Sequence, residues 1–273
     1  MTITMRFPEG KKKAFTLSYD DGHRCDLRFL DIINKYKLKC TFNVNMGLIP
    51  DSTESTRLTK GEYSAYEGHE IATHGYTHPV FSNLSGEAVT YEICRDRAEA
   101  EALLGRIVRG HAYAYGDYDE KSVEILKNAC IAYARTTKAS GSFDLPENWL
   151  TLHPTCHHSD ERLFSLIDKF LEQDPKYKPF LFYVWGHTYE FDFNKERNNW
   201  DYADEFCKRI SGHTDTVWYA TNLEICDYVT AFKSLIFSMD TRLVRNPACT
   251  DVYIGIGSSD TCIKIGAGET VKL

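Results

Sequence analysis

The chain has 273 residues, of which 42% are hydrophobic and 26% are charged, and its formal net charge is −7. This length is near that of a single (β/α) barrel, and the hydrophobic content is ordinary for a globular protein. No stretch approaches the ~20 apolar residues of a membrane-spanning helix, and the basic run Lys11-Lys12-Lys13 is too short to form a nucleic-acid or membrane surface. We therefore expect no nucleic-acid partner and no membrane insertion, while the oligomeric state stays unknown.

Short β-rich runs alternate with amphipathic helical runs along most of the chain. In chain order, the expected elements are a strand at Ala14–Tyr19, a helix at Asp26–Tyr36, strands at Cys40–Asn45 and Glu70–Thr73, a helix capped by Ser85 and ending near Leu104, a strand at Ile107–Tyr113, a helix at Asp119–Asn128, strands at Ile131–Arg135 and Leu150–His153, a helix at Glu161–Glu172, a strand at Phe180–Trp185, a helix near 200–210, a strand at Val217–Tyr219 and a helix at Asn222–Phe237. Seven or eight such repeats predict an α/β protein with one closed or nearly closed parallel barrel, with an open doubly wound sheet as the alternative.

The last thirty residues have a different pattern. Asn246-Pro247 interrupts the helical pattern, and residues 251–256, 262–265 and 270–273 alternate like strands. We therefore expect a barrel domain over 1–240 and a small antiparallel C-terminal β appendage over 241–273.

The cysteines and the first residues bear on the compartment. Nine cysteines are scattered without a Cys-x-x-Cys pair, which favours a reducing environment over a disulfide framework or a thiolate zinc site. Met1 to Gly10 contain no hydrophobic signal region. Both features favour a cytoplasmic location, although a secreted chain trimmed of its signal peptide would have the same sequence.

Polar clusters follow several of the expected strands. Asp20 and Asp21 end the first strand. Adjacent carboxylates in a nearly buried place repel each other, so they indicate a bound cation or a proton held by one of them. His74 and His78 follow the third strand, so the chain offers the ligands of a catalytic divalent metal with a spare base beside them. Because the carboxyl ends of parallel strands gather at one face of a barrel, the later polar residues at strand ends should join them there. These later residues are Tyr115, His153, His157, His158 and His187.

Four of these motifs also carry a family resemblance. Ser18–Gly22, Thr73–Pro79, Tyr115-Gly116 and Trp185-Gly186-His187 follow one another in an order that resembles the polysaccharide deacetylase family (NodB-homology domains, carbohydrate esterase family 4). The resemblance extends from about residue 14 to about residue 230 and leaves the β appendage outside. It implies a distorted (β/α) barrel that hydrolyses N-acetyl or O-acetyl groups on sugars with one divalent metal ion.

The resemblance implies a ligand set and two proton-transfer groups. Asp21, His74 and His78 match the family's metal ligands. Asp20 matches the general base that takes a proton from the attacking water, and His187 matches the general acid that protonates the leaving amine. Outside the resemblance, Asp20 could instead close an Asx turn, and a histidine such as His187 could simply be a hydrogen-bonded core residue.

The remaining expected site residues depart further from the family pattern. Tyr115 matches the tyrosine whose backbone N–H helps to hold the oxyanion, but Ala112 occupies the usual position of an arginine. Arg109 and Arg135 are the two alternative cations that could orient Asp20. The expected substrate-binding residues are Tyr115, Trp149, Trp185 and His153, and structural roles remain open for the last three.

The predicted function is therefore a metal-dependent carbohydrate deacetylase acting on N-acetylated sugars. An O-acetyl (xylan-type) esterase and a small-molecule amidohydrolase with the same metal site are the alternatives, so the expected partner is a carbohydrate or an acetylated small molecule. A barrel that binds carbohydrate without catalysis is a third possibility. Zinc suits two imidazoles and one carboxylate, and cobalt, nickel, manganese or iron also accept this set.

Overall fold

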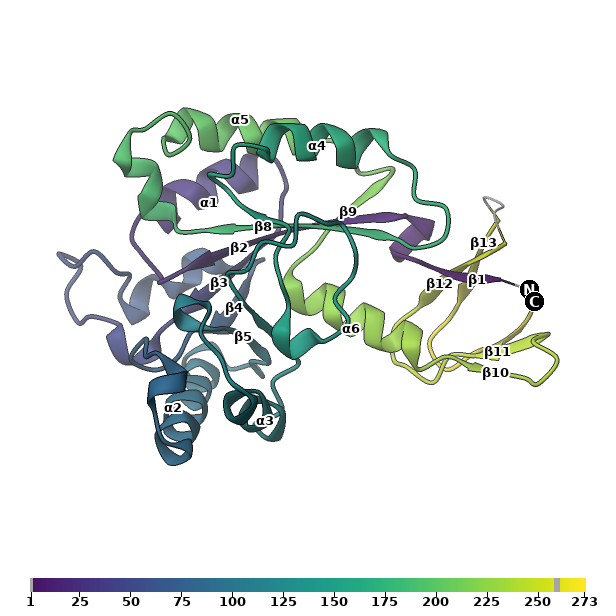
Figure 1. Cartoon of the computed structure of the whole chain (residues 1–273), viewed down its shortest axis with the longest axis horizontal. Helices are drawn as coiled ribbons and strands as arrows, with labels where there is room; N and C mark the ends of the chain where they lie inside the picture. The colour runs from purple at the N-terminus through teal and green to yellow at the C-terminus, as the bar shows by residue number, and fades with distance from the viewer. Residues whose placement is uncertain (1, 258–260) are drawn as a thin grey trace.

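A curled parallel sheet forms the centre of the computed structural model, which describes residues 2–257 and 261–273 (Figure 1). Its strand order is β6-β5-β4-β3-β2-β8-β7, and β9 pairs with the first residues of β2. All of these pairings are parallel, so the expected (β/α) barrel is confirmed as a half-barrel. The strands are β2 (Lys13–Asp20), β3 (Cys40–Val44), β4 (Glu70–Thr73), β5 (Gly110–Ala112), β6 (Tyr133–Arg135), β7 (Cys156–His157), β8 (Phe180–Gly186) and β9 (Val217–Tyr219).

One irregular segment joins the two edges of the curled sheet. Leu152 donates from its N–H to Ala134 on β6, and Thr155 donates to Tyr183 on β8 (both N···O distances are 2.9 Å). The prediction of a strand at Leu150–His153 is wrong, because Trp149–Thr151 form a 3-10 turn. The side chain of Asn148 caps this turn by accepting a hydrogen bond from the Leu150 N–H. Pro154, which has no N–H to donate, then prevents a regular ladder.

Six α-helices flank the sheet in the described part of the chain. Their ends follow local signals, since Ser85 accepts a hydrogen bond at the start of the second helix and Gly105, with φ of 64°, ends it. The helix expected at Asn222–Phe237 ends earlier, because Ile236 and Phe237 pair as a strand with residues 244–245. The helices are α1 (Asp26–Lys35), α2 (Gly86–Leu104), α3 (Glu120–Asn128), α4 (Leu163–Glu172), α5 (Trp200–Ile210) and α6 (Asn222–Lys233).

The side chains of β2 alternate between two environments, although all eight residues of the strand are buried. Phe15, Leu17 and Tyr19 pack into the apolar core that includes Phe29 of α1. The intervening residues face the concave side of the sheet, where the hydroxyl of Thr16 donates to Asn222 of α6. This alternation directs Asp20, at the end of β2, into the interior of the half-barrel.

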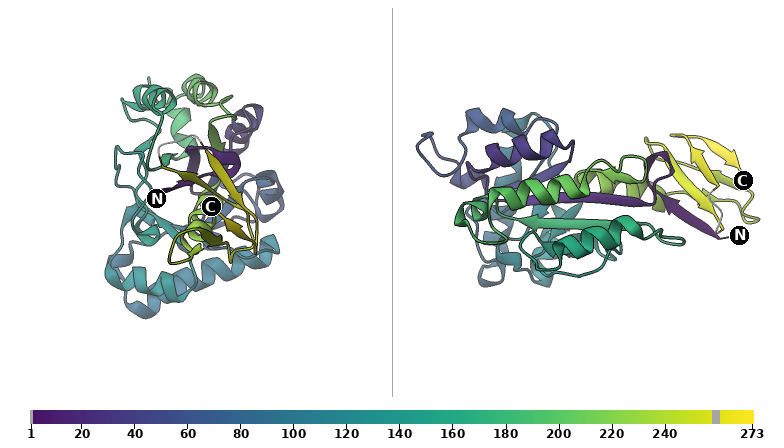
Figure 2. Two further views of the ribbon diagram at one scale, coloured as in Figure 1. Left: turned by 90° about the vertical axis from the view of Figure 1, so that its right-hand side faces the viewer. Right: turned by 90° about the horizontal axis from the view of Figure 1, so that it is seen from above.

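The β appendage consists of two small antiparallel sheets. One contains β1 (Ile3–Arg6), β12 (Val252–Ile256) and β13 (Cys262–Ile265), and the other contains β10 (Ile236–Phe237), β11 (Leu243–Arg245) and β14 (Thr270–Lys272). Strands β1 and β10 come from outside the expected range 241–273. The appendage adjoins the start of β2, so both chain ends lie far from the carboxyl ends of the strands (Figures 1 and 2). No helix among the described residues is long and apolar enough to span a membrane.

Candidate active site

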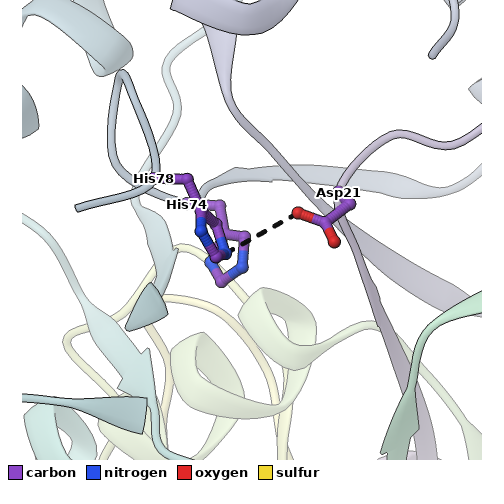
Figure 3. A group of neighbouring side chains, drawn as sticks. All are labelled: Asp21, His74 and His78. Atoms are coloured by element: carbon purple, nitrogen blue, oxygen red, sulfur yellow. Dashed lines mark ion pairs between the residues drawn. The ribbon is translucent and has the colours of Figure 1, made fainter. Parts of the chain in front are cut away.

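The carboxyl ends of β2 and β4 bring together three possible metal ligands. One ligand atom from each of Asp21, His74 and His78 lies within 4.8 Å of the other two (Figure 3). Asp21 and His78 both have positive φ angles, of 80° and 60°. Such angles are uncommon for residues other than glycine and indicate that the surrounding turns are constrained.

His74 is fixed in the form that a metal ligand requires. Its Nδ1 lies 2.8 Å from the carbonyl oxygen of Ala112 on β5, so this nitrogen carries the proton and Nε2 keeps a free lone pair. Its backbone N–H donates to the buried carboxylate of Asp96 at 2.9 Å. Burial lowers the pKa of His74, which keeps the imidazole neutral.

His78 and Asp21 complete the group. The distance from His78 Nε2 to Asp21 Oδ1 is 3.7 Å. Burial and the neighbouring His74 lower the pKa of His78 to about 4. The His78 imidazole is therefore also neutral near pH 7, the form in which it can offer a lone pair to a metal. Arg57 donates from one guanidinium nitrogen to the Asp21 backbone carbonyl, while its Nη2 lies 3.3 Å from Asp21 Oδ1. Arg57 was not anticipated from the sequence, since nothing around it resembles a motif.

Asp20 lies beside this group and is held by other partners. Its Oδ2 accepts from Arg135 Nη2 at 2.5 Å, and its Oδ1 accepts from Asn43 Nδ2 at 2.8 Å. Burial alone would raise the pKa of Asp20, but Arg135, His74 and His187 lower it below its usual value. These neighbours therefore favour the ionised form of Asp20.

The structure places the two candidate arginines in different regions. Arg135, on β6, is fully buried and contacts Asp20. Arg109 pairs at the surface with Asp227 of α6 at 2.5 Å and does not contact Asp20. The guanidinium that orients Asp20 in this structure thus comes from Arg135.

His187 approaches Asp20 from the end of β8. Its Nε2 lies 3.9 Å from Asp20 Oδ2, and its Nδ1 lies 3.4 Å from Glu190 Oε1. Burial opposes the charged form, but Glu190 and Asp20 outweigh it and raise the pKa of His187. Glu190 also lies near His157 and His158, and no sequence motif had drawn attention to it.

The expected substrate-binding residues are divided between the site and other regions. Tyr115 is 65% exposed, and its ring contacts His78 with a centroid distance of 4.6 Å. Trp185 is only 9% exposed and lies beneath the Arg135 guanidinium, so it forms an inner wall of the site.

The other two expected residues lie elsewhere. Trp149 is half-buried and packs against the apolar cluster that includes Leu152. His153 lies 2.6 Å from the Thr136 hydroxyl and lines a separate pocket with Ser140 and Asp144.

Comparisons with known proteins agree with the fold and the motifs. Residues 8–134 match the family model described as polysaccharide deacetylase. A chitooligosaccharide deacetylase from Rhizobium leguminosarum bv. trifolii is 27% identical over 115 residues, which are 41% of this chain and 51% of that protein. The chain thus spans about half the length of this curated relative.

Solved structures show the same fold at low sequence identity. A Mycobacterium smegmatis protein described as a candidate polysaccharide deacetylase superposes with a TM-score of 0.59 at 15% identity, covering 85% of this chain and 96% of that protein. A pseudoenzyme of carbohydrate esterase family 4 from Bacillus anthracis gives a TM-score of 0.50 at 15% identity, covering 82% and 68%.

The fold is a curled (β/α) half-barrel like that of these solved structures, and the order of the motifs resembles the polysaccharide deacetylase family. The resemblance to the polysaccharide deacetylase family is confirmed by the family-model match, which includes Asp20, Asp21, His74 and His78. His187 and Glu190 lie outside the matched residues.

Proposed function

We propose that this chain is a metal-dependent hydrolase that removes acetyl groups from N-acetylated sugars in a polysaccharide or oligosaccharide. The observation that carries the proposal is the convergence of Asp21, His74 and His78 at one end of the half-barrel, with Asp20 and His187 beside them. In this arrangement the proposed ligands, base and acid would act at one place, which supports amide hydrolysis as the reaction.

The donor set fits a catalytic divalent metal. Two neutral imidazoles and one carboxylate leave coordination positions open for water and substrate, and the Ala112 carbonyl fixes the tautomer of His74. We favour zinc, although cobalt, nickel, manganese and iron accept the same ligands. A bound ion would polarise the acetyl carbonyl and make a water more acidic.

The protein's own groups would move the protons. Asp20, kept ionised by Arg135, would accept the proton of the attacking water. His187 would donate from Nε2 to the leaving nitrogen, because an amine leaves far more readily after protonation. The backbone N–H of Tyr115 would donate to the oxygen of the acetyl carbonyl as negative charge develops on it.

Acetate release from a substrate panel tests this proposal. Protein stripped with a chelator and reloaded with zinc would be given chitooligosaccharides, acetylated xylan, peptidoglycan fragments and small amides. We expect acetate and an equal amount of free amine from the N-acetylated sugars, and neither from the stripped protein. Release from xylan alone would favour an esterase, release from small amides alone would favour an amidohydrolase, and release from none by metal-loaded protein would favour a non-catalytic barrel.

A further inference from the structure

A second group of titratable side chains lies beside His187, on the side away from Asp20. Glu190 belongs to the 3-10 segment Thr188–Phe193 that follows β8, and His157 and His158 lie at the end of β7. The Nε2 atoms of His157 and His158 are each 3.1 Å from Glu190 Oε2, while His187 Nδ1 is 3.4 Å from Glu190 Oε1. One carboxylate therefore has three imidazoles around it.

Strand pairing and close packing restrict the positions of these side chains. Strands β7 and β8 are parallel neighbours, and the N–H of His158 donates to the Trp185 carbonyl at 2.8 Å. The His158 ring lies directly against Gly186, where a Cβ atom would collide with it. His158 is fully buried and stacks on Tyr19 with an interplanar angle of 9°. His158 thus has a fixed position beside Glu190, and its Nε2 also lies 3.2 Å from Asn198 Oδ1.

We propose that Glu190, itself held by His157 and His158, is a positioning residue for His187. This inference rests on the proposed deacetylase function. Glu190 Oε1 lies 3.4 Å from Nδ1 of His187, an ion-pair contact without hydrogen-bond geometry, and its negative charge favours a proton on that nitrogen and draws that side of the ring toward Glu190. Nε2, on the opposite side of the ring, lies 3.9 Å from Asp20 Oδ2 and carries the proton that is transferred.

The step that Glu190 would assist is breakage of the C–N bond. The electron pair of that bond goes to nitrogen, the Nε2 proton of His187 transfers to the same nitrogen, and the products are a free amine and acetic acid, which then loses its proton to solvent as acetate. His187 is left neutral. An imidazolium stabilised by Glu190 is better suited to this task than an imidazole free to rotate, since both its charge and its direction are set before the reaction.

The leaving group provides a test that separates positioning from general support of the fold. An N-acetyl chitooligosaccharide needs a proton on its leaving nitrogen, whereas 4-nitrophenyl acetate releases a stable anion without one. We expect Glu190→Gln to lower kcat on the amide roughly 10–100-fold, the range typical of lost orienting partners. Hydrolysis of 4-nitrophenyl acetate should stay within about twofold. Glu196→Gln, the same change at an exposed residue of the following loop, should alter neither activity.

Other outcomes would overturn the inference. Equal losses on the two substrates would make Glu190 merely structural, and no loss on either would remove it from the mechanism. Because the ligand atoms of His157, His187 and Glu190 also lie within 4.8 Å of one another, two bound ions per wild-type chain, with one lost in Glu190→Gln, would assign a second metal site instead.

Two further measurements keep the test decisive. If Glu190→Gln does not fold, as judged by its circular dichroism, His157→Gln should show a smaller loss that is again confined to the amide. A metal-loaded wild-type protein that is inactive on both substrates would refute the proposed function, whereas an active wild type with an unaffected Glu190→Gln would refute only this inference.

Discussion

Arg135 and Asp20, 115 residues apart in the sequence, form a buried ion pair with an Nη2–Oδ2 distance of 2.5 Å. Arg135 belongs to β6 and Asp20 to β2, two strands that are not neighbours in the sheet. The pair therefore crosses the concave side of the half-barrel. The Arg135 guanidinium also lies 4.5 Å from the centre of the Trp185 ring. Its position links the stability of the fold to the charge state of the proposed base.

Replacing Arg135 should damage both stability and turnover. Arg135→Met keeps an apolar surface against Trp185 but leaves the Asp20 carboxylate buried without its cation. Loss of one partner of a buried pair typically costs about 3–5 kcal/mol, which urea unfolding would measure. The control is Arg109→Met, which removes a surface pair with Asp227 and should cost no more than about 1 kcal/mol. Similar losses in the two variants would contradict the assignment of Arg135.

Substitutions of the two adjacent aspartates should have different effects on metal content. Asp20→Asn removes the proposed base but none of the metal ligands, so the protein should retain its ion while kcat falls by about 10²–10⁴-fold. Asp21→Asn weakens the only carboxylate of the ligand group and should lower the metal content. Elemental analysis together with acetate release would distinguish these outcomes, and normal turnover in Asp20→Asn would exclude it as the base.

The two histidines after β4 should control metal binding and the stability that it confers. We expect about one divalent ion per wild-type chain and none in the His74→Ala, His78→Ala double variant. A ligand that binds only the folded state raises the melting temperature, so zinc should stabilise the wild type and leave the double variant unchanged. His153→Ala, which alters a histidine in a separate pocket, should behave as the wild type. An unchanged zinc response in the double variant would refute the site.

Asp26 should make stability depend on pH. It is buried on α1 and accepts hydrogen bonds from Thr188 and Tyr66, both at 2.6 Å. Burial raises the pKa of Asp26 from 3.8 to about 7. The folded protein thus keeps a proton that the unfolded chain releases near pH 4, and this contribution to the free energy of unfolding is lost as the pH rises from about 4 to about 7.

Asp26→Asn has no proton to lose over this range, so it should lose less stability than the wild type between about pH 5 and about pH 8. Urea unfolding in the presence of a chelator measures the difference without a contribution from bound metal. Asp31→Asn, at an exposed position of the same helix, should keep the wild-type pH dependence. An unchanged pH dependence in Asp26→Asn would contradict the prediction.

Local patterns predicted the elements that depend on local signals. The strands at Glu70–Thr73 and Val217–Tyr219 and the capped helix from Ser85 to Gly105 are found where periodicity and capping residues placed them. The strand expected at Leu150–His153 is not found, because its apolar residues gave no sign that Asn148 and Pro154 would impose an irregular turn.

Residues of the candidate site could be singled out where a motif is continuous in sequence, and less so where their partners come from distant strands. Asp20, Asp21, His74 and His78 form two compact motifs at strand ends. The choice of Arg135 over Arg109 depends on how the sheet curls, which no local pattern reveals. Glu190 was not singled out from the sequence, because its contacts with His157 and His158 arise only when β7 and the residue after it lie alongside β8.

The pairing of β1 with β12 also affects how this protein could be joined to others. Both ends of the chain lie within the β appendage, beside the start of β2, while the candidate catalytic groups occupy the opposite end of that strand (Figures 1 and 2). A fusion partner, an affinity tag or a surface-coupling group attached at either end would therefore project away from the reaction centre. Attachment through the β appendage would leave the candidate catalytic groups on the side facing away from a support.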